Sequence, residues 1–402
     1  MKLNKFFMLG LAGLAFAACS NEELAENGEL GNGDGQTVKV TLSRGKATTR
    51  AIDGTAVGGY NTVRSLSVCF YSAGDQIVFK KEVTPDTDAD FFENINNGET
   101  SHKSVLTIGG VPGNAKRIYI IANEPDTKIN TNTWETVKAS EVHLAEMLAT
   151  EEGDTFNEQS AVLTGYQANI GAGNLVDEVM TVNVNVELKP VASRFEIDGF
   201  VCKNVPAGSN YEGLPVKEFE ICGVYMNNFY DKGYLDPTQD DPDRTQISYK
   251  DAADFTAAKY GEWSFMLDEG VISGNVYSAI EGYTSVAELE DDEIYALKRT
   301  DNKVLGYPLL QGDVPHIIIR LNVTYDNNNI DEQAVKYLTI EKFKADGGNW
   351  NGEIERGNVY KITDLAFDPS NLSDIPYEGT KSVVATVSVA AWTGVPLQPD
   401  WN

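Results

Sequence analysis

The chain has 402 residues, of which 42% are hydrophobic, and 60 acidic against 32 basic residues give it a net charge of −28. This size allows two domains with separate cores, whereas the charge excludes nucleic-acid binding through phosphates and adhesion to an anionic membrane surface. Abundant Thr, Val and Tyr, and a scarcity of long helical patterns, predict a mostly β protein.

Residues 1–18 predict a signal peptide. Two lysines precede the apolar run 6–18, which is too short for a stable transmembrane helix. The residues that follow resemble a lipobox, in which a lipoprotein signal peptidase cuts between Ala18 and Cys19 and Cys19 carries the lipid. Phe16 stands where an aliphatic residue is preferred, so ordinary secretion with cleavage after Ala18 is the alternative.

The next feature is a short strand followed by a basic segment. Val38, Val40 and Leu42 alternate with polar residues, which predicts a half-buried strand over residues 37–43. The chain then runs to Arg50 and into the flexible-looking segment that starts at Ala51. An arginine-specific protease could cut between Arg50 and Ala51 and so remove the strand, leaving an apolar groove for another strand.

Two other interpretations of this stretch stay open. The strand could be an ordinary first strand and Arg50 an ordinary loop residue. Arg44 is a second candidate for the cut. With the lipid on Cys19 and the cut after Arg50, residues 19–50 are predicted to be a lipidated propeptide that includes the first strand.

A first β domain is predicted over residues 51–190. One helix is expected at residues 134–149, capped by Thr133 or Ser140. Alternating or apolar runs predict strands at 66–70, 77–79, 105–108, 116–123 and 180–188.

A second β domain is predicted over residues 191–380, with the clearest strands at 219–226, 317–325, 335–340 and 359–365. Residues 381–402 follow as a separate segment. Its strand-like part is small or apolar on both faces, which suits a strand covered on both sides. It is predicted to be a donor strand that another subunit covers; the alternative is the last strand of the second domain's own sheet. The residues expected to take part are Val383, Ala385, Val387, Val389 and Trp392.

We find no catalytic motif, metal-ligand spacing or cofactor fingerprint, so no catalytic residue, metal or cofactor is predicted. The oxygen-rich stretches 240–243 and 326–329 could hold Ca²⁺, but they lack the Gly and Glu of an EF-hand loop, which favours solvated turns. A disulfide between Cys202 and Cys222 is left open.

Several landmarks together resemble the FimA-type fimbrillins, the major subunit family of the Bacteroidetes type V pilus. They are the lipobox at Cys19, Arg50 after a first strand, and the segments LKPVASRF (188–195), IERGNVYKI (354–362) and VSVAAW (387–392). The resemblance implies two tandem β-sandwich domains of transthyretin-like arrangement, with one or few short helices.

The resemblance also implies a function. An outer-membrane lipoprotein precursor would lose the segment up to Arg50 and then accept the C-terminal strand of a neighbour, so that adhesive fimbriae form at the cell surface. Implied partners are copies of the chain, other pilus subunits, an arginine-specific protease, and host-surface or bacterial ligands. The membrane would be reached only through the lipid of the precursor. The rival classes are a surface glycan-binding lipoprotein and a secreted β-rich hydrolase.

Overall fold

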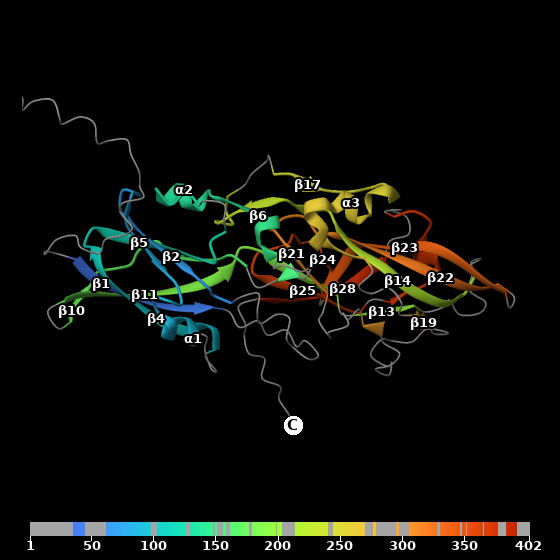
Figure 1. Ribbon diagram of the computed structural model, residues 1–402, viewed down its shortest axis with the longest axis horizontal. Helices are drawn as coiled ribbons and strands as arrows, with labels where there is room; N and C mark the ends of the chain where they lie inside the picture. Colours follow the sequence, from blue (N-terminus) through green and yellow to red (C-terminus); the bar gives the residue numbers. More distant parts are fainter. Residues whose placement is uncertain are drawn as a thin grey trace, which may run out of the picture.

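The computed structural model shows an elongated molecule, with the earlier strands at one end and the later strands at the other (Figure 1). Strands predominate and the helices are short, which confirms the mostly β class. The residues that the structure describes are 35–44, 62–97, 103–125, 129–147, 149–150, 156–157, 161–176, 179–197, 199–202, 214–239, 244–269, 276–278, 295–296, 305–327, 330–345, 348–350, 352–364, 366–376 and 383–391.

The first domain is a sheet that folds into two layers at its longest strand, β11 (Val179–Pro190). β11 pairs with β1 (Gly35–Arg44) along most of its length but with β9 (Leu163–Gln167) only at its last two residues. The strand order is β3 (Ile77–Val83), β2 (Leu66–Ser72), β5 (Ala115–Ala122), β9, β11, β1 and β4 (Lys103–Pro112), with β10 (Asn174–Val176) paired on β11.

The core of this domain lies between the two layers. Every second residue of β1, β4 and β11 points inward, as the sequence alternation predicted, and these side chains meet those of β2 and β5. The arrangement is a β-sandwich. α1 (Ala89–Asn97), which sequence analysis missed, adds Phe91, Phe92 and Ile95 to the same core.

The helix expected at residues 134–149 is wrong in length. α2 (Trp134–Lys138) begins as predicted, with Thr133 as its N-cap in a capping box with Thr136. It ends after five residues because Glu141–His143 forms β6, which pairs with β16 (Lys232–Tyr234) of the second domain. Val142 is fully buried there. A β-pairing partner distant in the sequence has overridden a locally helical pattern.

The second domain begins at β12 (Ser193–Ile197), directly after β11, and is built on one large sheet. Its order is β18 (Leu267–Glu269), β14 (Val216–Asn227), β22 (His316–Asn327), β23 (Ile330–Ala345), β28 (Val383–Ala391), β25 (Asn358–Asp364), β12 and β21 (Leu305–Leu309). β19 (Val276–Ser278) pairs with β14, and β24 (Gly348–Trp350) and β27 (Leu372–Ser373) pair with β23.

Short elements complete this domain. The small sheets pair β13 (Gly199–Cys202) with β20 (Tyr295–Ala296) and β26 (Ala366–Phe367), and β15 (Phe229–Tyr230) with β17 (Gln246–Ile247). α3 (Ala257–Tyr260) lies nearby (Figure 1), and in the first domain β7 (Ala149–Thr150) pairs with β8 (Phe156–Asn157). Short 3₁₀ turns lie at Leu144–Met147, Ala252–Asp254, Gly261–Met266 and Pro369–Asn371.

The large sheet bends between β23 and β12, so that side chains of both strands share a second core. Phe195 of β12 and Phe343 of β23 lie three strands apart in the sheet, a separation of about 14 Å if the sheet were flat. Their ring centroids are only 5.3 Å apart. This layered packing agrees with the second predicted sandwich.

A buried ion pair sits in β12. Arg194 and Glu196 are both about 1% exposed, and the guanidinium Nε donates to the carboxylate over 2.8 Å. Gly306 of β21 leaves the room for this guanidinium, because a Cβ at that position would lie 2.0 Å from it.

Candidate functional site

The candidate site is the position that β1 occupies in the first sheet (Figure 1). β1 is an inner strand: it runs parallel to β11 on one side and antiparallel to β4 on the other. Val38 lies opposite Val182 and Ile108, and Val40 opposite Val184 and Leu106. A segment at the start of the chain thus holds together two strands that come much later in the sequence.

Three side chains of β1 belong to the core. Val38, Val40 and Leu42 are fully buried, whereas Lys39 between them is exposed. Burial of three such side chains contributes roughly 5–9 kcal/mol. The predicted half-buried strand is therefore confirmed. Because β1 pairs on both sides, its loss would break two strand ladders, whereas the loss of an edge strand would break one.

Without β1, the space between β4 and β11 would be an apolar groove. Its walls would be the inward side chains of those two strands, and each strand would present an unpaired row of backbone N–H and C=O groups. These walls are formed by Leu106, Ile108, Val182, Val184 and Val186, all of them at most 4% exposed.

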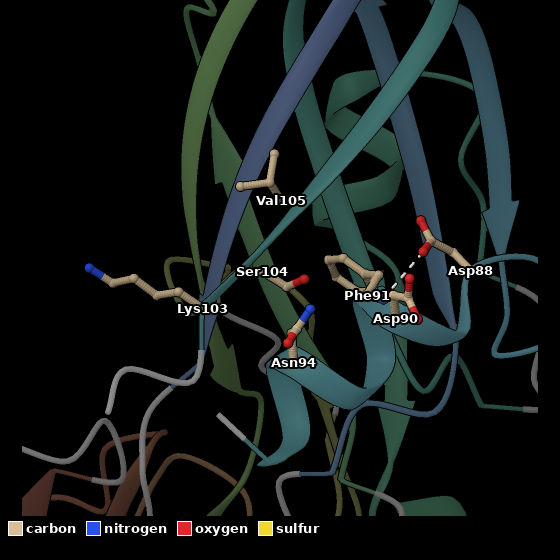
Figure 2. A pocket seen from close by; sticks show the side chains of 7 residues that line it. All are labelled: Asp88, Asp90, Phe91, Asn94, Lys103, Ser104 and Val105. Atoms are coloured by element: carbon tan, nitrogen blue, oxygen red, sulfur yellow. Dashed lines mark hydrogen bonds between the residues drawn. The ribbon is translucent and has the colours of Figure 1, made fainter. Parts of the chain in front are cut away.

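A pocket of about 390 Å³ adjoins the end of this position, where β1 leaves the sheet (Figure 2). Ser104 and Lys103 line the pocket and are the β4 partners of Leu42 and Ser43. α1 closes the other side, and the carboxylate of Asp88 accepts the backbone N–H of Phe91 over 3.2 Å. Its remaining lining residues are Asp90, Asn94 and Val105.

β28, the predicted donor strand, also lies inside a sheet. It runs parallel to β23 and antiparallel to β25, with Val387 opposite Ile362 and Val389 opposite Tyr360. Ala385 is fully buried. The expectation that this strand lacks a partner within its own subunit is thus wrong. The reason is that its two apolar faces suit a central strand of its own domain equally well.

The remaining sequence-predicted residues cannot be placed. Ala18, Cys19, Arg50, Ala51 and Trp392 lie outside the described residues. The same holds for residues 240–243 and 328–329 of the two oxygen-rich stretches. No helix in the described ranges is both long enough and apolar enough to span a membrane.

Cysteines and histidines form no cluster in the part of the chain that the structure describes. Cys69, Cys202 and Cys222 are free thiols, so the Cys202–Cys222 bridge is not formed. We find no group of three or more His, Cys, Asp or Glu side chains placed to hold a metal there. His316 is half-buried at the start of β22, and this partial burial lowers its pKa to about 4.

Arg356 joins the two domains beside the end of β11, a role that sequence analysis missed. Its guanidinium donates to the carbonyl of Pro190 over 3.2 Å, to the hydroxyl of Thr164 over 2.7 Å, and to the carbonyl of Leu235. Gly357 follows in the left-handed region (φ 73°), where a β-carbon would be strained. Burial lowers the pKa of Arg356, while Tyr119 and nearby groups oppose this shift. The only sequence signal was that Arg356 lies in one of the fimbrillin-like segments.

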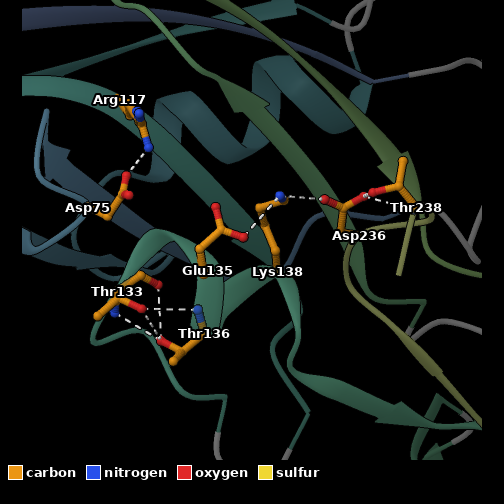
Figure 3. A network of polar contacts seen from close by, with 8 residues as sticks. All are labelled: Asp75, Arg117, Thr133, Glu135, Thr136, Lys138, Asp236 and Thr238. Atoms are coloured by element: carbon orange, nitrogen blue, oxygen red, sulfur yellow. Dashed lines mark hydrogen bonds and ion pairs between the residues drawn. The ribbon is translucent and has the colours of Figure 1, made fainter. Parts of the chain in front are cut away.

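A second contact between the domains lies at α2 (Figure 3). Lys138 pairs with Asp236 over 3.2 Å, and the backbone N–H of Asp236 donates to the carbonyl of Lys138. Burial alone would raise the pKa of Asp236, but hydrogen bonds from Thr238 and the ion pair with Lys138 outweigh it and lower this pKa. Together with the β6–β16 pairing, these contacts hold the second domain against the end of β11.

No protein-family model matches the sequence, and no curated protein matches it either. Among solved structures, the chain is similar to a fimbrilin (FimA) from Porphyromonas gingivalis W83, with 14% identity and a TM-score of 0.47, over 90% of this chain and 99% of that one. A proposed cell adhesion protein from Parabacteroides distasonis gives 17% identity and a TM-score of 0.47, over 90% and 98%. The fimbrial anchor protein Mfa2 from P. gingivalis gives 11% identity and a TM-score of 0.32, over 74% and 82%.

Proposed function

We propose that the chain is a structural subunit of a surface filament, a pilus of the fimbrillin type. It is exported as a lipoprotein precursor with its lipid on Cys19 and is matured by cleavage between Arg50 and Ala51. Subunits then join by strand exchange, with copies of the chain and other pilus subunits as partners. The role is structural and has no catalytic step.

One observation carries the proposal: β1 is an inner strand of the sheet, yet it is linked to the rest of the chain only through the segment that holds Arg50. Arg44, the other candidate for the cut, ends β1 opposite Leu188 within the ladder of hydrogen bonds. A protease needs an extended backbone free of such pairing, so the ladder disfavours a cut at Arg44. After the cut, β1 is held by non-covalent contacts alone and can be replaced.

The pairing of β28 supports it as the replacement strand. β1 and β28 each lie between one parallel and one antiparallel neighbour. Their sequences also match: TVKVTL at residues 37–42 corresponds to TVSVAA at residues 386–391. In this register Val387 takes the place of Val38, Val389 that of Val40, and Ala391 that of Leu42.

Exchange has a cost that an unpartnered strand would not have. β28 must first leave its place between β23 and β25, so the donor's own sheet opens there. The gain is the closure of the groove in the accepting subunit. Because a similar ladder and a similar apolar face are lost and regained, exchange is close to balanced, and dilution of the cleaved β1 peptide drives it forward by mass action.

A peptide competition experiment tests this function. The precursor is cleaved after Arg50 in vitro and polymerisation is followed by sedimentation and electron microscopy. A synthetic peptide of residues 35–50 in excess should block polymerisation, whereas a peptide of the same composition in scrambled order should not. Arg50→Ala should leave an uncleaved, lipid-bearing monomer. Normal filaments from Arg50→Ala at the wild-type mass would refute the maturation step.

The alternative is a surface glycan-binding lipoprotein. Tyr166 is 48% exposed and stacks on Tyr119 with ring centroids 5.8 Å apart, which is the kind of face that binds a sugar ring. Tyr166 is the single aromatic among the exposed large apolar side chains that the structure describes. Mass spectrometry of the protein from the cell surface separates the two functions, because a glycan-binding lipoprotein keeps residues 19–50 and the lipid.

A further inference from the structure

An apolar patch covers the tip of the hairpin between β10 and β11. Leu175 is 70% exposed, and Val176, Val179 and Met180 are each 44% exposed. Leu175 lies opposite Met180 and Val176 opposite Val179. Since neighbouring positions point to opposite faces of a strand, the tip is apolar on both faces and neither face serves the core. We call these four residues the hairpin patch.

A second patch lies on β23 in the other domain. Val335 is 44% exposed and Ile375, shortly after β27, is 56% exposed. β27 pairs antiparallel with β23 through Ser373 and Tyr337, and Lys336 forms an ion pair with Asp374. These contacts place Ile375 beside Val335. We call the two residues the β23 patch.

The two patches lie in different domains, towards opposite ends of the long axis. Figure 1 shows β10 at one end and the hairpin that joins β22 to β23 at the other. Of the large apolar side chains that the structure describes as exposed, only Val105 and Tyr166 fall outside the two patches. A molecule with one apolar patch towards each end is suited to head-to-tail contact between copies.

The direction of β11 decides which end of the groove lies beside the hairpin patch. β11 runs from the hairpin patch to Pro190, where the second domain begins and Arg356 binds the strand's last carbonyl groups. One end of the groove therefore lies beside the subunit's own second domain and the other beside the hairpin patch. A strand from another copy enters at the hairpin patch and runs in the direction of β1.

The connecting chain is short enough to bring the patches together. In the register of the proposed function, Thr386 takes the place of Thr37, which pairs with Thr181 directly after Met180. Residues before Thr386 leave the groove beside the hairpin patch. Seven residues lie between Ile375 and Val383, so the two Cα atoms are at most roughly 28 Å apart when the chain is extended. The β23 patch of the donor thus lies within reach of the mouth of the acceptor's groove.

We propose that the hairpin patch of one copy packs against the β23 patch of the copy that donates its strand. This is a second contact at each junction, beside the inserted strand, and it rests on the proposed strand exchange. It limits rotation about the inserted strand, because two separate points then join each pair of subunits.

Charge substitutions at the two patches test the contact. Full-length precursor carrying Leu175→Lys or Ile375→Glu is cleaved after Arg50, and the subunit concentration needed for filament formation is measured by sedimentation. Each single variant should raise that concentration roughly tenfold, as expected for loss of one buried apolar side chain and burial of a charge. The double variant should return towards wild type, because the introduced ammonium and carboxylate groups meet across the junction.

Ser248→Lys is the control: Ser248 is exposed and lies outside the groove and both patches, so this variant should polymerise like wild type. Unchanged melting temperatures of the monomers verify that all variants fold. If the single variants polymerise like wild type, or if the double variant gives no recovery, the contact is refuted while strand exchange stands. If cleaved wild-type protein forms no filaments, the proposed function itself fails, and this contact with it.

Discussion

The guanidinium of Arg356 in the second domain donates a 2.7 Å hydrogen bond to the hydroxyl of Thr164 in the first. Thr164 lies opposite Lys189 at the point where β9 meets β11. The same guanidinium binds the carbonyl of Pro190. The strand that borders the proposed groove is therefore fastened to the second domain at its last residues.

Arg356→Ala should loosen this fastening. The substitution removes the hydrogen bonds that the charged guanidinium donates and leaves two carbonyls and one hydroxyl without this donor. We expect it to lower the unfolding free energy by about 2 kcal/mol. Thermal unfolding should show a lower melting temperature, and small-angle scattering a larger radius of gyration as the domains separate. Lys116→Ala, at an exposed position of β5, is the control. An unchanged radius of gyration would show that the β6–β16 pairing alone holds the domains.

Gly306→Ala should strongly destabilise the second domain. The added methyl would lie 2.0 Å from the guanidinium of Arg194 and force the buried ion pair with Glu196 apart. Disruption of a buried pair costs roughly 3–5 kcal/mol, measurable by urea unfolding. Gly109→Ala is the matched control, because nothing lies within 4 Å of a Cβ there. Equal effects at the two glycines would contradict the steric explanation.

His316 should make the protein less stable in mild acid. Burial lowers the pKa of this imidazole from 6.5 to about 4, although Asp313 acts against the shift. The unfolded chain therefore binds a proton that the folded chain excludes between these two pH values. This contribution is fully present above pH 6.5 and is lost as the pH falls towards 4, by roughly 3 kcal/mol at most. In His316→Gln the fall of unfolding free energy over this window should be smaller; an identical pH profile would contradict the assignment.

Ala391→Leu should strengthen filaments. In the proposed register Ala391 takes the position of Leu42, so the inserted strand leaves a void where a leucine was buried. Filling that void should add about 2 kcal/mol per junction, seen as a higher temperature of filament disassembly in detergent. Ala390→Leu, one position away on the opposite face, should lack this gain. A gain at residue 390 instead would shift the register by one residue.

Val387→Asp should harm both monomer and filament. β28 lies between β23 and β25 in the monomer, so a carboxylate there disturbs the subunit's own sheet. The same carboxylate would be buried without a partner in the acceptor's groove, at a cost of several kcal/mol. The melting temperature of the monomer should fall and filaments should be lost. A monomer as stable as wild type would show that β28 leaves its sheet before assembly.

The alternation of buried and exposed residues along a single strand could be predicted from sequence, whereas the strands with which it pairs could not. Val38, Val40 and Leu42 marked β1, and the five-fold alternation ending at Leu188 marked β11. The same criterion could not tell whether residues 383–391 are covered by their own sheet or by another subunit, because apolar faces look alike in both cases. The helix that began correctly at Trp134 ended early for a related reason: its continuation pairs with residues 232–234.

Polar contacts between the domains escaped sequence analysis for a different reason. Arg356 binds backbone carbonyls and one hydroxyl, and acceptors of this kind leave no recognisable signature in a sequence. Gly306 matters because it has no side chain and so leaves room for the guanidinium of Arg194. Sequence alone does not show that these two residues are neighbours. Such relations depend on which strands are neighbours, and that is decided by the whole fold.

The interior position of β1 also bears on how the protein folds. β1 is made first, but its partners β4 and β11 follow far later in the chain, so its docking closes long loops and is slow compared with the formation of hairpins such as β2–β3. A precursor carries this strand on the same chain and should therefore regain its fold after denaturation. A chain that has lost residues 1–50 must refold around an open groove. Cleavage would thus convert a protein at equilibrium into one that persists only because it unfolds slowly.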